Sequence, residues 1–190
     1  MTLHRHTMRL GILLLVGAVI GFGLAVEATQ ADNFSAHVGE RGAIQFPNDF
    51  RTTMVHLGSW FIPEGEASGF HDVYTEARSV EAYRKTGRFP DGATLVKELR
   101  GAKRGDYTTG ANVGFAVDTV KQWFVMIKDT KGRFPDNPLW GDGWGWALFN
   151  PKDPAKNIAS SYQKDCLGCH VPAKKTDWVY IEAYPTLKSR

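Results

Sequence analysis

The sequence predicts an α+β protein that is mainly β, with one antiparallel sheet, a few helices and a cysteine motif near the C-terminus. Three observations predict this fold. Short stretches are rich in β-branched and aromatic residues, turns containing glycine and proline separate them, and helical patterns occupy only two short segments. About 160 residues remain once a leader over residues 1–31 is set aside, and that length suits one domain with a hydrophobic core.

Each element has a local signal. Four segments show alternating polarity or enrichment in aromatic and β-branched residues and are predicted strands: residues 71–79, 93–99, 120–128 and 143–149. Turn-forming glycine, proline, asparagine and aspartate separate them at residues 90–92, 131–132 and 135–138. A short helix is expected over residues 80–86, closed by Gly87, and a second over residues 153–165, opened by Asp153 and Pro154.

The N-terminus has the order of a secretory signal. A short basic region precedes an unbroken apolar run over residues 10–26, and the small residues Ala28 and Ala31 follow. We therefore expect a signal peptide over residues 1–31, cleaved after Ala28 or Ala31, and a single domain over residues 32–190. An uncleaved membrane anchor is the alternative, although the run is short for a membrane span and no basic stop follows it.

The charge balance constrains the partners. The formal net charge is +3 and no block of like charges occurs, which argues against a nucleic-acid-binding protein. We expect small molecules and redox proteins as partners, and no membrane association once the signal is removed.

The only two cysteines lie in the run Cys166-Leu167-Gly168-Cys169-His170. Two thiols at this spacing can add across the two vinyl groups of one haem, and the histidine that follows is placed to ligate its iron. The motif therefore predicts one covalent haem c bound by Cys166 and Cys169, with His170 as an axial iron ligand. Haem c is attached outside the bacterial inner membrane, so the motif and the signal both indicate the periplasm.

Three other kinds of site also use closely spaced cysteines. A redox dithiol normally follows a strand at the start of a helix, whereas the segment before Cys166 is polar and helix-like. A disulfide between cysteines this close would close a very short loop and constrain little. A zinc site needs four ligands, and no second cysteine pair supplies them.

The order of several motifs resembles the cytochrome P460 family, which includes the β-type cytochromes c′. The resemblance runs from about Pro47 to Leu187. It is carried by Lys85-Thr86-Gly87-Arg88-Phe89-Pro90-Asp91-Gly92-Ala93-Thr94-Leu95-Val96-Lys97-Glu98-Leu99, Lys128-Asp129-Thr130-Lys131-Gly132-Arg133-Phe134, Cys166 to His170, Ala173-Lys174-Lys175-Thr176-Asp177 and Tyr184-Pro185-Thr186-Leu187. It implies a homodimeric, sheet-rich fold whose haem has a histidine on one side and an open or weakly held position on the other.

Lys97 aligns with the lysine that cytochromes P460, which oxidise hydroxylamine, join covalently to the porphyrin edge. On a strand over residues 93–99, Leu95, Lys97 and Leu99 share one face. If that face is buried, desolvation favours the neutral, nucleophilic amine that attack on a haem edge requires. If the other face is buried, Lys97 is an ordinary solvated residue, or it reaches past its neighbours to water.

Phe124 is where the chain departs from the hydroxylamine oxidases. Their distal glutamate, which moves protons, aligns with Phe124, and phenylalanine cannot accept a proton. Asp118 and Asp129 are the only nearby substitutes. The β-type cytochromes c′ instead bind nitric oxide and carbon monoxide under phenylalanines, and Phe124 and Phe89 are candidates for such a distal cap. Each of these two residues can equally be an ordinary core residue.

We therefore expect a periplasmic monohaem cytochrome c with an open distal iron site that binds or transforms small nitrogen species, chiefly nitric oxide. If the protein is an enzyme, it is a hydroxylamine or nitric oxide oxidoreductase. One alternative is a hydroxylamine-oxidising cytochrome P460 with Lys97 joined to the haem. A second is a plain electron carrier in which a side chain such as Met126, on the strand face of Phe124, supplies a sixth ligand. The expected partners are a nitrogenous or gaseous ligand such as nitric oxide, carbon monoxide or hydroxylamine, a periplasmic redox protein, and a second copy of the chain.

Overall fold

The computed structural model describes Met1 and residues 34–188. The predicted signal peptide and its cleavage sites at Ala28 and Ala31 lie outside the described residues. In the part of the chain that is described, no helix has the length and apolar character needed to cross a bilayer.

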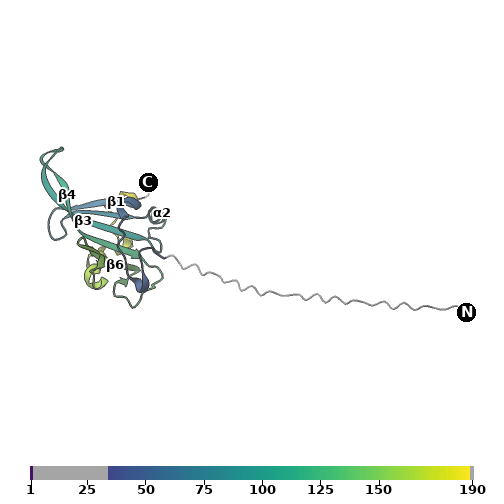
Figure 1. The fold of residues 1–190 in the computed structure, drawn as a ribbon. Coiled ribbons are helices and arrows are strands. Elements are labelled where there is room, and N and C mark those ends of the chain that lie inside the picture. Colours follow the sequence, from purple (N-terminus) through teal and green to yellow (C-terminus); the bar gives the residue numbers. More distant parts are fainter. Residues whose placement is uncertain (2–33, 189–190) are drawn as a thin grey trace. The chain divides into compact units, whose positions relative to one another are not determined.

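One antiparallel sheet dominates the fold (Figure 1). Its seven strands are β1 (Val55–Ile62), β2 (Gly69–Thr75), β3 (Thr94–Tyr107), β4 (Gly110–Lys128), β5 (Trp140–Gly141), β6 (Trp144–Asn150) and β7 (Asp153–Asn157). They are arranged in the order β1-β2-β3-β4-β6-β5, with β7 alongside β6, and every pairing is antiparallel. The predicted α+β, mainly β fold is confirmed.

The helices are short. They are η1 (Glu40–Gly42), α1 (Phe50–Thr53), α2 (Ala77–Thr86), η2 (Gln163–Leu167), α3 (Gly168–His170), η3 (Val171–Thr176) and η4 (Pro185–Leu187). Helix α2 ends at Gly87 as predicted, because this glycine adopts the left-handed conformation that closes a helix (φ 70°). The helix begins earlier than expected, so the prediction of a strand over residues 77–79 is wrong. The Glu76 carboxylate fixes this start by accepting hydrogen bonds from the Ser79 hydroxyl and the Thr94 amide.

The predicted helix over residues 153–165 is also wrong. Residues 153–157 form β7, which pairs with β6, and helical backbone starts only at Gln163. Pro154 is compatible with this strand because β7 pairs with β6 alone and lies at an edge of the sheet. The helical turn itself begins where the Asp165 carboxylate accepts hydrogen bonds from the Ser160 and Ser161 amides.

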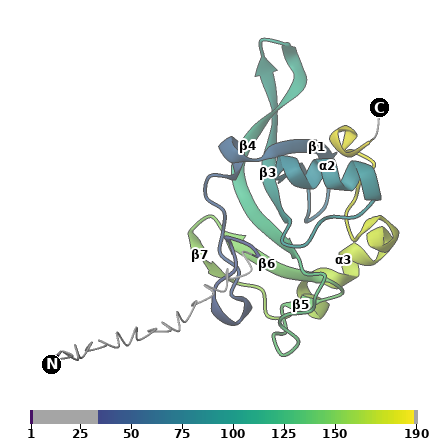
Figure 2. The same cartoon turned by 90° about the vertical axis from the view of Figure 1, so that its right-hand side faces the viewer.

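Strands β3 and β4 extend far beyond their predicted lengths. Together they form a long hairpin that projects from the body of the sheet and turns between Tyr107 and Gly110 (Figure 2). The hairpin beyond residue 100 and the whole of β1 have no counterpart among the predicted elements.

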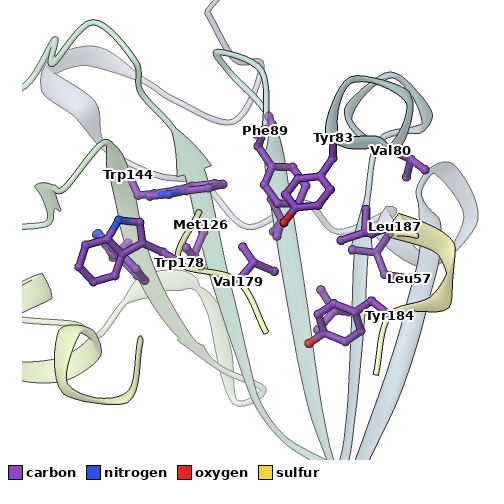
Figure 3. Packing of buried hydrophobic residues seen from close by; sticks show 14 residues of the cluster. Leu57, Val80, Tyr83, Phe89, Met126, Trp144, Trp178, Val179, Tyr184 and Leu187 are labelled. Carbon is purple, nitrogen blue, oxygen red and sulfur yellow. The ribbon is translucent and has the colours of Figure 1, made fainter. Parts of the chain in front are cut away.

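The sheet separates two hydrophobic clusters. One face is covered by the N-terminal segment, including Ile44 and Phe50, which pack with Val96 and Phe149. The other face is covered by helix α2 and by residues 166–187, whose apolar side chains join those of the strands (Figure 3). The segment that carries the cysteine motif therefore lies against one defined face of the sheet.

Candidate functional site

A cavity lies between that face of the sheet and the C-terminal segment. Its volume is about 210 Å³. The sheet contributes Val73, Leu95, Lys97, Phe124, Met126 and Trp146, and the C-terminal segment contributes Asp165, Cys166, Cys169, His170, Val179, Tyr180 and Tyr184. The wall is mainly apolar, and the cysteine motif contributes two thiols and one imidazole to it.

Strand alternation brings Lys97 to this cavity. In β3, Leu95 and Lys97 share one face, and across the β3–β4 pair they lie opposite Met126 and Phe124. Val73 lies beside Lys97 on β2. Leu95 and Lys97 therefore lie on the face of β3 that lines the cavity, and Val96 and Glu98 on the other face are buried as well.

The Lys97 ammonium lies in an apolar setting. Its Nζ atom is 3.8 Å from the centroid of the Phe124 ring, a cation–π contact. Burial lowers the pKa of Lys97 from its ordinary value to about 8. The Lys97 amine therefore loses its proton more readily than the amine of a solvated lysine.

The motif residues lie on consecutive helical turns. Cys166 belongs to η2, whereas Cys169 and His170 belong to α3, and the helical backbone continues into η3. Residues three apart on a helix share one side, so the two thiols lie on the same side and both line the cavity. Both cysteines are free.

One ring nitrogen of His170 is committed to the backbone. Nδ1 lies 2.7 Å from the carbonyl oxygen of Trp178. A carbonyl only accepts hydrogen bonds, so Nδ1 carries the proton and the Nε2 lone pair is available to a metal. Burial lowers the pKa of His170, which keeps the ring neutral. The Trp146 ring packs edge-on against it at a centroid distance of 4.9 Å.

The protonation of Cys166 argues against a redox dithiol. Burial raises the pKa of its thiol to about 11, whereas a reactive cysteine needs a lowered pKa. A structural metal site lacks ligands too, since no group of three or more histidine, cysteine, aspartate or glutamate side chains able to hold a metal ion occurs within residues 34–188.

Residues 47–181 match the family model described as cytochrome P460. The chain belongs to the cytochrome P460 family. The matched region contains the sheet, the cavity lysine and the complete Cys166–His170 motif. Membership in the cytochrome P460 family supports a c-type haem cytochrome. No curated protein matches the chain.

The residues present fit the haem that the cytochrome P460 family implies. Two free thiols at the required spacing and a neutral histidine with an available Nε2 line one cavity. Cys166 and Cys169 would hold the porphyrin, and His170 would hold its iron.

The other predicted site residues divide into two groups. Phe124 and Met126 line the cavity with Lys97. Phe89 does not reach it, because its ring is buried between Tyr83 and Trp144 in the hydrophobic cluster, where Figure 3 shows it. Of the two proposed cap residues, only Phe124 therefore lines the cavity.

Neither candidate carboxylate reaches the cavity. Asp129 is buried at the end of β4, where it accepts hydrogen bonds from the Arg133 guanidinium and backbone amide. Asp118 lies on the projecting part of β4, beside Gly101.

Sequence reasoning missed two tyrosines and one carbonyl. Tyr180 donates a hydrogen bond to the carbonyl oxygen of Cys169, and Tyr184 is buried in the cavity wall, where burial raises its pKa. Both tyrosines follow the cysteine motif closely in the sequence, and this proximity is the signal that could have identified them as residues of the site. The Trp178 carbonyl had none, because no sequence pattern shows which backbone oxygen a histidine will meet.

Proposed function

We propose that this member of the cytochrome P460 family is an exported monohaem cytochrome c that binds or transforms small nitrogen species, chiefly nitric oxide. The haem is joined to Cys166 and Cys169 through thioethers, and His170 is its axial ligand. One observation carries the proposal: the three motif residues line a single, mainly apolar cavity in which His170 already has its Nδ1 proton committed to a carbonyl.

A haem bound there supplies an iron with one axial position free for an external ligand. Two apolar residues of the cavity favour small neutral ligands for that position. Phe124 and Met126 present apolar groups, which disfavour water and anions and provide no hydrogen bond to bound dioxygen. Phe124 is proposed as the distal cap.

Hydroxylamine oxidation is a second candidate because Lys97 lies in the same cavity with a lowered pKa. A neutral amine is the form that can attack a porphyrin edge. In this candidate Lys97 is joined to the haem, and a group other than Phe124 accepts the proton.

The setting of the protein is part of the proposal. A signal peptide over residues 1–31 delivers the chain to the periplasm, where it works as a homodimer, exchanges electrons with a periplasmic redox protein, and does not bind nucleic acid or membrane. Intact-protein mass spectrometry of material purified from the periplasm tests the export. The expected mass is that of residues 29–190 or 32–190 plus one haem.

Absorption spectra of the ferrous protein test the proposal. We expect a five-coordinate, high-spin haem whose spectrum changes on addition of carbon monoxide. A six-coordinate, low-spin spectrum that carbon monoxide leaves unchanged would favour an electron carrier with a ligand such as Met126. Colourless protein from a host that matures cytochromes c, or pigment removed by acid-acetone extraction, would refute covalent haem binding.

Lys97→Arg distinguishes the two candidate functions. A strongly red-shifted spectrum and a mass showing attachment beyond two thioethers indicate a lysine cross-link, and Lys97→Arg then abolishes both. The matched control is Lys121→Arg, since Lys121 lies on β4 with its ammonium bonded to the Ser68 carbonyl. If neither variant changes the spectrum or the number of haem attachments that the mass indicates, Lys97 has no covalent role.

A further inference from the structure

The carbonyl that orients His170 belongs to a turn with unusual backbone geometry. Asp177 and Trp178 have φ values of 61° and 67°, so two consecutive residues with a Cβ adopt the left-handed conformation. This conformation costs free energy for any residue other than glycine, and two in succession require something to hold them.

A buried carboxylate holds this turn. Asp177 is 1% exposed, and its Oδ1 atom accepts a hydrogen bond from Lys128 Nζ at 2.6 Å. Its Oδ2 atom accepts a hydrogen bond from the Phe89 amide at 2.8 Å. The Arg88 guanidinium lies 3.6 Å from Oδ1 but is largely exposed, so Lys128 is the main buried charge partner.

Lys128 is itself fixed at the end of β4. Its backbone amide donates to the Ala93 carbonyl and its own carbonyl accepts from the Gly92 amide, both at 2.8 Å. Its ammonium lies 4.7 Å from the ring of Trp144, which is fully buried. Separating Lys128 from Asp177 would leave a buried charge without a partner, which is strongly destabilising. The ion pair is therefore expected to stay formed.

The turn is continuous with the cavity. The Trp178 amide bonds back to the Ala173 carbonyl, and the Trp178 ring packs edge-on against Trp146, which itself contacts the His170 ring. Figure 3 shows Trp178 and Val179 close to Met126 and Trp144 of the sheet. A movement of Asp177 would therefore move the carbonyl that receives the His170 proton.

We propose that Lys128 is a positioning residue for the axial histidine: its ion pair with Asp177 fixes the left-handed turn so that the Trp178 carbonyl stays on Nδ1 of His170. The inference rests on the proposed haem site. A strong hydrogen bond from Nδ1 raises the electron donation of Nε2, so Lys128 influences the iron without touching the haem.

Lys128→Met tests the inference through two measurements. Amide hydrogen exchange over residues 176–179 reports on the turn without reference to the haem, and the variant should exchange at least about ten times faster because the turn loses its anchor. The iron–histidine stretching frequency of the ferrous protein, measured by resonance Raman, should fall, and the reduction potential should rise. Lys128→Arg should restore both.

Asp177→Asn is the second variant, since asparagine tolerates the left-handed conformation and removes only the charge. It should shift both readouts in the same direction even if Lys128→Met folds poorly. Arg51→Met, which breaks the ion pair to Glu98 on the opposite face of the sheet, is the control and should leave the iron–histidine frequency unchanged.

Each result has one meaning. Unchanged exchange in Lys128→Met and Asp177→Asn overturns the anchoring of the turn. Faster exchange with an unchanged iron–histidine frequency overturns the positioning role. Wild-type protein that shows no iron–histidine mode overturns the proposed haem site itself, and with it the positioning role, whereas the exchange data still report on the turn.

Discussion

Phe124 is the residue on which the choice between ligand binding and hydroxylamine chemistry depends most directly. Its ring lies under the Lys97 ammonium in the cavity wall, at the position where the resemblance to hydroxylamine oxidases expects a glutamate. Hydroxylamine oxidation requires removal of protons, and Asp165, which also lines the cavity, is already bonded to Ser160 and Ser161.

Phe124→Glu should therefore raise the rate of hydroxylamine oxidation. A positioned general base contributes about 10²–10⁴-fold, and we expect at least a tenfold increase over wild type with an added electron acceptor. The new carboxylate would also pair with Lys97, which makes its burial tolerable.

Phe124→Gln is the matched control, because glutamine has the same shape and cannot accept the proton. Steady-state rates are compared for wild type and both variants. Equal rates in the glutamate and glutamine variants would contradict a role for the missing carboxylate.

At the residue scale, the sequence shows which residues lie together where the pattern is local. Cys166, Cys169 and His170 lie within one run of five residues and line one cavity, and the face of Lys97 follows from the two-residue period of a strand. Phe89 could not be placed, because its ring is directed by a turn and by contacts with Tyr83 and Trp144 from two other elements. The Asp177–Lys128 pair joins residues 49 positions apart and has no local signal.

At the element scale, the C-terminal segment depends on a close backbone approach to β1. Gly58 lies at a bulge in β1 with a φ of 154°, and a Cβ there would come within 2.0 Å of the Ala183 carbonyl oxygen. Ala183 precedes Tyr184, which lines the cavity. Only glycine lets the strand and the C-terminal segment meet at this distance.

Gly58→Ala should destabilise the fold by about 2–4 kcal/mol, because backbone must shift to make room. Gly65→Ala is the matched control: Gly65 also has a positive φ of 87°, but a Cβ there meets nothing within 4 Å. It should lose only about 1 kcal/mol. Chemical denaturation measures both values, and a similar loss in the two variants would show that conformation alone, and not the contact with Ala183, sets the cost.

The secondary-structure predictions were wrong where strand pairing outweighs the local preference of the sequence. Asp153 and Pro154 are typical of a helix start, yet β6 offers an edge to which the segment pairs as β7. The hairpin beyond residue 100 contains Gly101, Gly105, Gly110 and Gly114, which weaken any strand signal. It becomes strand because each arm extends a predicted strand of β3 or β4, and the pairing shifts register between Leu99 and Ala102, where the hairpin begins.

At the scale of the whole molecule, the projecting hairpin presents an apolar row. Val113, Phe115 and Val117 alternate along β4 and are 67%, 46% and 42% exposed. Burial of such a row stabilises association, so we expect the hairpin to contribute to the proposed homodimer.

The triple variant Val113→Ser, Phe115→Ser, Val117→Ser should raise the dimer dissociation constant, measured by sedimentation velocity, at least tenfold. This is a change of about 1.4 kcal/mol, which loss of part of the row readily supplies. The control is Val171→Ser, a residue 53% exposed on the C-terminal segment. A wild-type monomer would contradict the homodimer, and a dimer that the triple variant leaves intact would exclude this row as its interface.

The stability of the whole fold in acid should depend on an ion pair that joins two turns. Asp91, in the turn before β3, lies 2.6 Å from the Arg133 guanidinium, in the turn after β4. Asp91 also accepts hydrogen bonds from the amide and hydroxyl of Thr130. The hydrogen bond from Arg133 is the main cause that lowers the pKa of Asp91 to about 2.

A carboxylate whose pKa is lower in the folded than in the unfolded chain stabilises the fold above its unfolded pKa of about 4, and this contribution is lost as the pH falls toward 2. Asp91→Asn should therefore reduce the free energy of unfolding by about 1–2 kcal/mol at pH 7, and the difference from wild type should vanish near pH 2. Asp136→Asn, an exposed carboxylate in the turn beyond Arg133, is the control and should follow wild type. Urea denaturation at pH 7, 4 and 2 measures the difference, and a loss in Asp91→Asn that stays constant with pH would show that packing, rather than the charge, stabilises these turns.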